Sequence, residues 1–428
     1  MVKLMIQGCE SMVQTLKKSI RFVYDDMLLP LLCFIFLVLA FCFEAPIDVF
    51  KGYISILLSK SILITDYIAV GGLGATFLNV STILLFNMIV IKKMKLTLNG
   101  PIFAGLIMIL GFSFFGKNLV NTLPIYFGIY LYTLYKKSHF KNYIITVLFS
   151  TGISPLVSYT MFSINPLFGI PLGILAGTIV GFLLPVISTH AILFHKGYNL
   201  FNTGFALGII SMLFYGLYSG FGLEVVTEKL INDEYHYFLL ILLTIICFTF
   251  IIVSFIANKK VIKDYLKILP KSGRLVSDFI REGSKSVVLF NFGILGLLAL
   301  FWTLIFDIRL NGATFGTIIS VIGFASFGIH IKNALPIWIG AIIGVYALGG
   351  EYFNSVSTAI CFFFCLGLAP IAGKYGPIYG IIAGFLHIMI TPLMIGFQGG
   401  FDLYNNGFSA GFVAFIVVSI KEAIKEDY

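Results

Sequence analysis

The chain contains the same sequence pattern twice. The stretch LNGPIFAGLIMILGFSFFG, which starts at Leu98, returns as LNGATFGTIISVIGFASFG from Leu310. Further on, Asn121-Thr-Leu-Pro-Ile returns as Asn333-Ala-Leu-Pro-Ile. The spacing is constant over this block, since 333 − 121 and 310 − 98 both equal 212. Two copies of one unit in an apolar chain are typical of many transporters and channels.

A second block is also repeated. Gly197-Tyr-Asn-Leu-Phe-Asn-Thr-Gly-Phe-Ala-Leu-Gly becomes Gly400-Phe-Asp-Leu-Tyr-Asn-Asn-Gly-Phe-Ser-Ala-Gly. Here the spacing is 400 − 197 = 203, which indicates that the loops between the two blocks differ in length. The repeat therefore covers most of the chain.

The composition places both copies in a membrane. Of the 428 residues, 59% are hydrophobic and 11% are charged, whereas soluble domains carry about 25% charged residues. The mean hydropathy is +1.02. The apolar runs 28–43, 237–257 and 287–306 have the length that a bilayer core demands. The expected fold class is all-α, a polytopic transmembrane helical bundle whose main partner is the lipid bilayer.

The net charge of +9 does not indicate a nucleic-acid partner, because most Lys and Arg residues lie between apolar runs, where they set orientation. Basic clusters at 92–95, 136–141 and 259–285 mark the cytoplasmic side of a cell membrane of bacterial type. The six cysteines form no CxxC pair, so neither a redox nor a zinc site is expected. No metal or other cofactor is predicted.

The flanking charges predict an inverted repeat. The run 75–91 ends at a basic cluster, whereas its copy 287–306 begins at one, so the two cross the membrane in opposite directions. Segments 52–71 and 264–283 correspond to one another, and the second is too polar to span a bilayer. We expect both to be interfacial or re-entrant, which places both termini in the cytoplasm.

These rules divide the chain into an interfacial helix (1–27), a first membrane repeat (28–219), an extracytoplasmic connector (220–236), a second membrane repeat (237–420) with a basic cytoplasmic segment (259–285), and a cytoplasmic tail (421–428). About 14 hydrophobic segments result, and several are short enough to be re-entrant half-helices. They are expected near 28–46, 74–92, 100–116, 119–135, 143–163, 167–187 and 199–219, and near 237–257, 286–307, 312–328, 333–349, 354–372, 376–395 and 403–420.

The first candidate pathway residues are Asn99-Gly100 and Asn311-Gly312, which open two short apolar segments. Asn can cap a helix, and a helix N-terminus inside a cavity presents free N–H groups to a solute. The alternative is an ordinary cap at the membrane surface.

The second candidates come from the later block, where Asn199 and Asn202 correspond to Asp402 and Asn405. Amides both donate and accept hydrogen bonds, which suits a small polar solute. The alternative is a capped helix start with closely packed glycines. A carboxylate within the membrane is costly and usually functional, so Asp402 is a candidate coupling residue, as is Asp66.

Other charged residues near these blocks are not expected to bind a solute. His195 and Lys196 are expected in a cytoplasmic loop, and Lys117 is expected at the membrane interface. The stretch from Gly111 to Asn118 fits GxxxxGK but lacks the final Ser or Thr, so it is not a phosphate loop.

Taken together, the blocks Asn-Gly-x-x-x-x-Gly with Leu-Pro-Ile, and Gly-Tyr-Asn-Leu-Phe-Asn-Thr-Gly, resemble a bacterial multi-pass membrane family of unknown function, over nearly the whole chain. A fainter similarity is to the urea transporter family. Asn99-Gly100-Pro101 and Gly197-Tyr198-Asn199 resemble stretches of that family, although its Leu-Pro-x-Thr-x-Pro signature is absent. This resemblance implies a solute pathway between two inverted halves.

The sequence thus predicts a transporter or channel that passes a small polar solute between two inverted repeats. One alternative is an ion- or proton-coupled secondary transporter, and another is a membrane-embedded enzyme or assembly subunit. No catalytic motif is found, so an enzyme is not expected. Assembly into a homo-oligomer is compatible with this architecture.

Overall fold

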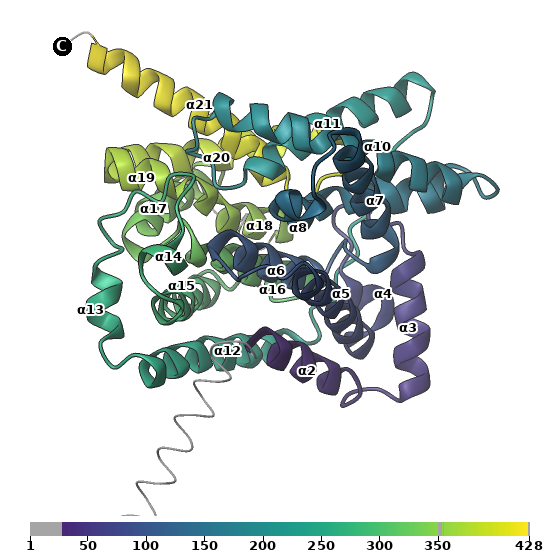
Figure 1. Ribbon diagram of the computed structural model, residues 1–428, viewed down its shortest axis with the longest axis horizontal. Coiled ribbons are helices and arrows are strands. Elements are labelled where there is room, and N and C mark those ends of the chain that lie inside the picture. Colours follow the sequence, from purple (N-terminus) through teal and green to yellow (C-terminus); the bar gives the residue numbers. More distant parts are fainter. Residues whose placement is uncertain (1–27, 350–352, 354, 427–428) are drawn as a thin grey trace, which may run out of the picture.

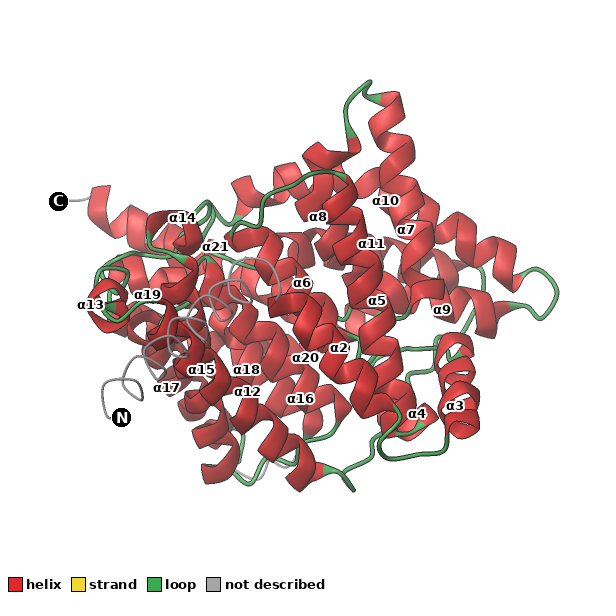
Figure 2. Ribbon diagram, turned by 60° about the horizontal axis from the view of Figure 1, so that its bottom comes forward, coloured by secondary structure: helices red, strands yellow, loops and turns green. Residues whose placement is uncertain are grey.

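The computed structural model describes residues 28–349, 353 and 355–426. The helix expected over 1–27 lies outside the described residues. Within them, the regular elements are helices, and nine helical stretches are long and apolar enough to cross a membrane; two of these, Phe140–Ile164 and Val356–Tyr375, consist of several short consecutive helices. Figures 1 and 2 show these helices packed into one bundle.

The helices follow one another in the same order in the two repeats. In the first they are α2 (Leu28–Ala40), α3 (Pro46–Leu58), α4 (Tyr67–Gly71), α5 (Leu73–Lys93), α6 (Gly100–Phe112), α7 (Leu119–Tyr135), α8 (Ile144–Ser150), α9 (Ser154–Tyr159), α10 (Gly169–Phe194) and α11 (Asn202–Gly220). In the second they are α12 (His236–Ala257), α13 (Val261–Leu266), α14 (Phe279–Glu282), α15 (Lys285–Ile305), α16 (Gly312–Ile322), α17 (Ile331–Ala347), α18 (Val356–Phe364), α19 (Ala369–Tyr375), α20 (Pro377–Gln398) and α21 (Asn405–Glu426).

Helices α6 and α16 are equivalent in the two repeats and pack against each other at the centre of the bundle (Figure 1). A Cβ atom on Gly111 would lie 2.3 Å from the Gly316 carbonyl oxygen, and one on Gly316 would lie 2.2 Å from the Gly111 oxygen. The start of α6 at Gly100 lies beside Ser326, and the start of α16 at Gly312 lies beside Phe114. The two helices are therefore antiparallel, and only glycine permits their backbones to come so close.

The same hydrogen bonds recur in both repeats. The amide nitrogen of Asn79 donates to the carbonyl oxygens of Ser113 and Lys117, both at 2.8 Å. Its counterpart Asn291 donates to Ala325 and Ile329 at 2.9 and 2.7 Å. Both asparagines are fully buried, and the four carbonyls belong to the segments that follow α6 and α16, where the regular α-helix is interrupted. A buried amide thus satisfies backbone groups that no helix can satisfy at this break.

The segments 52–71 and 264–283 contain only short helices. The first holds the end of α3 and the five-residue α4, and the second holds the end of α13 and the four-residue α14. No helix of these segments is among the nine that are long and apolar enough to span a membrane, in the part of the chain that the structure describes. Outer elements α3 and α13 lie on opposite sides of the central pair in Figure 1.

Candidate functional site

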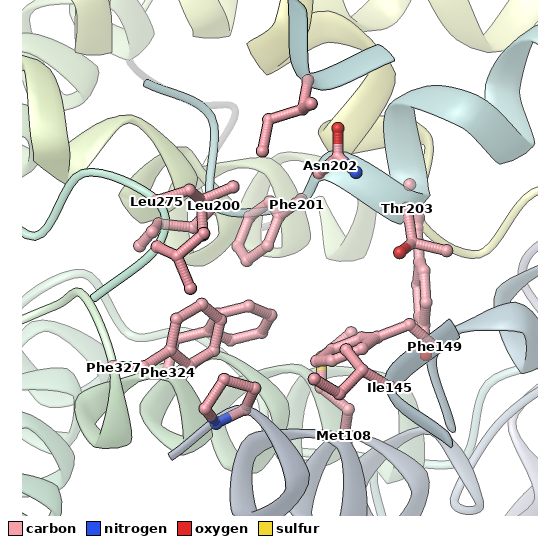
Figure 3. A pocket seen from close by; sticks show the side chains of 15 residues that line it. Met108, Ile145, Phe149, Leu200, Phe201, Asn202, Thr203, Leu275, Phe324 and Phe327 are labelled. Carbon is pink, nitrogen blue, oxygen red and sulfur yellow. The ribbon is translucent and has the colours of Figure 1, made fainter. Parts of the chain in front are cut away.

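A cavity of about 200 Å³ lies between the two repeats (Figure 3). The first repeat supplies residues of α6, α8, α10 and the start of α11, and the second supplies the loop before α14, the turn after α16 and Tyr404. The wall is mostly apolar, with aromatic rings from Phe149, Phe201 and Phe324. Polar groups come from Asn202 and Thr203, at one edge in Figure 3.

The cavity opens at a mouth beside Val276 and Ile145, whose exposed fractions are 86% and 40%. Val276 corresponds to Ile64 in the first repeat, since 276 − 64 = 212. Ile64 is only 3% exposed. The two repeats therefore differ: one mouth is open and the equivalent mouth is covered.

The connector between α11 and α12 covers the mouth at Ile64. The Leu230 N–H donates to the Ile64 carbonyl at 3.1 Å, and the Asp66 N–H donates to the Leu230 carbonyl at 2.9 Å. An exposed ion pair joins Lys60 to Glu228 at 3.3 Å. We call residues 62–66 together with 228–232 the closed gate.

Asp66 ties the closed gate to the central helices. One carboxylate oxygen accepts from the Ile68 N–H at 2.8 Å, and the other accepts from Asn232 and from Gly312, both at 3.1 Å. Gly312 is the first residue of α16, so a carboxylate of the first repeat caps the central helix of the second. The side chain is fully buried, and this burial raises the pKa of Asp66 to about 7.

The equivalent residue Asp278 makes the reciprocal contact. One of its oxygens accepts from the Ile280 N–H at 3.0 Å and from the Gly100 N–H, at the start of α6, at 3.1 Å. The Asp278 side chain is 13% exposed and forms an ion pair with Arg281 at 3.4 Å. Each repeat thus holds the N-terminus of the other repeat's central helix, where the helix dipole favours a negative charge.

Between the cavity and the closed gate lies an aromatic cluster. The ring of Phe112 packs against Phe115, Phe364 and Tyr404, with centroids 4.9, 5.5 and 4.7 Å away. All four residues are at most 5% exposed. This cluster is the counterpart of the rings that line the cavity, and it separates the cavity from the covered mouth.

Lys117 is the charged residue of this cluster. The side chain is fully buried, and its ammonium lies 4.7 Å from the ring centroid of Phe112 and 4.5 Å from that of Tyr404. The ammonium also donates to the hydroxyl of Tyr404. Tyr404 also lines the cavity, so the Tyr404 side chain lies between the cavity and the buried Lys117 ammonium. The expectation that Lys117 lies at the membrane interface was wrong, because aromatic faces and a phenol hold the ammonium inside the bundle.

Asp402 lies two residues before Tyr404, in the loop between α20 and α21. The side chain is fully buried, in the loop that also carries Tyr404, whose hydroxyl accepts from the Lys117 ammonium. One carboxylate oxygen accepts from the Tyr404 N–H at 2.8 Å, and the other has no hydrogen-bond partner among the described residues. Asp402 is therefore a buried carboxylate, the kind of group that is costly within a membrane and usually functional.

The candidate residues from the sequence do not converge on one point. Asn99 and Asn311 cap α6 and α16 by accepting from Ile102 at 2.9 Å and Thr314 at 3.0 Å. Because α6 and α16 are antiparallel, these caps lie at opposite ends of a pair about 20 Å long, for 13 residues at 1.5 Å each. The Gly100 N–H donates to Asp278 and the Gly312 N–H donates to Asp66, so each of these groups points to an aspartate of the other repeat and not into a cavity.

The two candidate asparagines of the second block, Asn202 and Asn405, lie in different surroundings. Asn202 borders the cavity and is held by His195 at 2.9 Å and by the Ser188 carbonyl at 3.0 Å. His195 lies in the loop after α10, as expected, and its side chain is buried there. Asn405 is 3% exposed and accepts from Asn406 at 2.8 Å. Only Asn202 among the predicted pathway residues lines the cavity.

Sequence reasoning missed Lys117 and Tyr404. The signal for both is a difference between the two copies: Lys117 corresponds to Ile329, and Tyr404 corresponds to Phe201. Together with Asp402, which corresponds to Asn199, these differences gather at the aromatic cluster, although Lys117 comes from the first repeat and the other two from the second. The difference between Asp402 and Asn199 had already selected Asp402, and the same comparison extended to these two positions would have selected Lys117 and Tyr404.

Comparison with known proteins gives a family and no function. No curated protein and no solved structure matches the chain. A family model described as "Protein of unknown function (DUF1576)" matches residues 45–219 and again residues 257–423. The starts of these matches are 257 − 45 = 212 residues apart, the same spacing as the sequence repeat. The chain is a polytopic helical membrane protein with two copies of this unit, and it belongs to the DUF1576 family.

Proposed function

We propose that this protein is an alternating-access transporter for a small solute, in which two inverted repeats exchange conformations. The observation that carries the proposal is the difference between Val276 and Ile64, equivalent residues that are 86% and 3% exposed. If the repeats exchange conformations, the mouth at Ile64 opens as the mouth at Val276 closes. Inverted repeats provide such paired states in many secondary transporters.

The charges support a cytoplasmic position for the open mouth. The segments around the mouth carry Lys136, Lys141, Lys196, Lys271 and Arg274, whereas the connector of the closed gate carries Glu224, Glu228, Asp233 and Glu234. Basic residues prefer the cytoplasmic side. In this orientation the structure corresponds to an inward-facing state of a bacterial-type cell membrane protein.

The wall of the cavity favours a small solute with an apolar body and one polar end. Rings and aliphatic side chains make up most of the wall, and the amide of Asn202 and hydroxyl of Thr203 offer hydrogen bonds at one edge. The packed rings of Phe112, Phe364 and Tyr404 argue against a permanently open channel. A few placed polar groups in an apolar wall are usual for sites that bind small molecules.

The test is a reversible lock on the closed gate. Thr65 and Leu230 form a bridge between neighbouring backbones, so Thr65→Cys with Leu230→Cys supplies two thiols that oxidation can join. The cysteines are placed in a background with Cys42→Ser. Proteoliposomes are then assayed with radiolabelled alanine, lactate, urea and glycerol.

We expect at least one of these solutes to cross, and we expect oxidation to abolish its flux and reduction to restore it. Each single-cysteine variant serves as a control, and its flux should not change with oxidation. Flux that persists through the cross-linked gate, or no protein-dependent flux of any of the four solutes, would contradict the proposal.

A further inference from the structure

We propose that Asp402 is the proton-binding site of this transporter, and that its bound proton makes a hydrogen bond to the Gly204 carbonyl, which the carboxylate cannot make. The inference rests on the proposed transport function and names its coupling ion. It follows from a chemical difference between two equivalent positions, Asn199 and Asp402.

The loops before α11 and before α21 share one backbone geometry. The Leu200 N–H donates to Gly367 at 2.9 Å, and its counterpart Leu403 donates to Gly152 at 2.8 Å. In the same way, Asn199 accepts from the Phe201 N–H at 2.9 Å, and Asp402 accepts from the Tyr404 N–H at 2.8 Å. In both Asn199 and Asp402, the first side-chain oxygen therefore accepts a hydrogen bond from the backbone N–H two residues later.

The second side-chain atom has a partner in only one loop. The amide nitrogen of Asn199 donates to the Gly407 carbonyl of the other repeat at 2.7 Å. Gly407 corresponds to Gly204, since 407 − 204 = 203, and these two glycines are in direct contact between α11 and α21. The equivalent acceptor for Asp402 is thus the Gly204 carbonyl, but the second carboxylate oxygen of Asp402 has no hydrogen-bond partner in the part of the chain that the structure describes.

The chemistry of the two groups explains this difference. A carboxylate only accepts hydrogen bonds, whereas a carboxylic acid has one O–H donor, as an amide has N–H donors. When a proton from water binds the second oxygen, Asp402 gains the donor that Asn199 always has. The protonated form then makes the contact between α11 and α21 symmetric, and loss of the proton breaks it on one side only.

The surroundings favour a proton over a metal cation as the ion that binds here. An ammonium at Lys117 opposes either cation, but a metal cation also needs several oxygen ligands, whereas a proton needs only the one carboxylate oxygen that has no partner among the described residues. The faces of Phe112 and Tyr404 stabilise this ammonium, so Lys117 does not depend on Asp402 alone. Among the described residues, the other titratable groups around this loop are the phenols of Tyr126, Tyr159, Tyr215, Tyr218 and Tyr404 and the imidazole of His387.

The loop that carries Asp402 also contacts both ends of the pathway. The Leu63 N–H donates to the Gly400 carbonyl at 3.2 Å, which joins the loop to the closed gate. A Cβ atom on Gly400 would lie 2.9 Å from Thr227 of the connector. At its other end, Tyr404 lines the cavity. A change at Asp402 therefore acts on the segment that separates the cavity from the gate.

The internal repeat supplies matched variants for a test by infrared spectroscopy. The carbonyl stretch of protonated carboxyl groups is followed against pH in proteoliposomes of the full chain. Asp402→Asn should remove one titrating carboxyl, and Asn199→Asp should add one, because Asn199 lies in the equivalent loop. Asp66→Asn identifies the contribution of the other buried carboxyl.

If the Asp402→Asn protein shows the same titrating carboxyl signal as the unaltered protein, the proposal is overturned, whether or not the protein transports a solute. Asn199→Asp provides the second arm if Asp402→Asn fails to fold. A folded Asn199→Asp protein without an additional protonated carboxyl would also overturn it.

The functional arm uses the labelling of Val276→Cys by a membrane-impermeant maleimide, in a background with Cys42→Ser and Asp66→Asn. Because maleimide reacts with the thiolate, each rate is divided by the rate of a free thiol at the same pH. We expect this ratio to change with pH, by up to tenfold per pH unit for one proton, and to become independent of pH in Asp402→Asn. An unchanged pH profile in Asp402→Asn would show that its proton does not couple to the mouth. Flux through the gate could then still be present, so this result is distinct from failure of the transport proposal.

Discussion

Among single residues, the buried amides and carboxylates explain how a chain with broken helices remains stable in a membrane. Asn79 and Asn291 satisfy two carbonyls each at equivalent breaks, and Asp66 and Asp278 cap helices of the other repeat. The sequence identified Asn99 and Asn311 as helix caps correctly. It did not identify Asn79, because an asparagine in the middle of an apolar run has no local signal for the carbonyls that it will meet.

Replacement of either buried asparagine by leucine should destabilise the protein. Asn79→Leu keeps a similar volume but leaves two buried carbonyls without a donor, at about 1–3 kcal/mol for each group. Asn291→Leu should cost a similar amount because its bonds are equivalent. The measurement is thermal unfolding in detergent. Thr303→Val is the control, since the Thr303 hydroxyl bonds only to a carbonyl of its own helix. Equal stability of Asn79→Leu and the control would contradict this role.

Protonation of Asp66 should stabilise the closed gate. Burial raises its pKa to about 7 in the closed gate, whereas a carboxyl in water titrates near 3.9. The closed form therefore binds a proton more tightly than an open form, and its relative stability falls as the pH rises through about 7. Because maleimide reacts with the thiolate, each labelling rate is divided by the rate of a free thiol at the same pH. We expect this ratio for Ile64→Cys to increase as the pH rises from 6 to 8, by no more than tenfold per unit. The dependence should disappear in Asp66→Asn, and persistence there would assign it to another group.

At the scale of whole helices, the apolar runs in the sequence correctly predicted where most of the helices lie along the chain. The run expected near 119–135 is α7 (Leu119–Tyr135), and the run near 237–257 is α12 (His236–Ala257). The polar content of 264–283 correctly predicted that no long apolar helix forms there. What could not be predicted is which helices meet across the repeats, because that depends on glycines whose partners lie far away in the sequence.

The contact between α6 and α16 should not tolerate a side chain. In Gly111→Ala the new Cβ would lie 2.3 Å from the Gly316 carbonyl oxygen, so the two helices would have to separate. We expect a loss of about 1–3 kcal/mol, typical of overpacking in a core. Gly216→Ala in α11 is the matched control, since a Cβ there meets nothing within 4 Å, and it should be neutral or slightly stabilising. Unfolding in detergent compares the two variants, and equal stabilities would refute the close contact.

For the molecule as a whole, the repeat in the sequence predicted two similar halves, and the matches at 45–219 and 257–423 confirm them. The sequence could not predict that the halves differ in conformation, because Val276 and Ile64 are both ordinary aliphatic residues. The difference comes from the connector, which covers Ile64 through the Leu230 backbone. If the inverted halves alternate in access, the two mouths are reached from opposite sides of the membrane.

The most direct measurement is the side of the membrane from which each mouth reacts. Val276→Cys and Ile64→Cys are each labelled with a membrane-impermeant maleimide, in intact cells and in inside-out vesicles, with Cys42→Ser as the background. We predict that Val276→Cys reacts quickly and only in inside-out vesicles, and that Ile64→Cys reacts slowly and only in intact cells. Reaction of both cysteines from the same side would contradict the inverted arrangement, and with it the proposed mechanism.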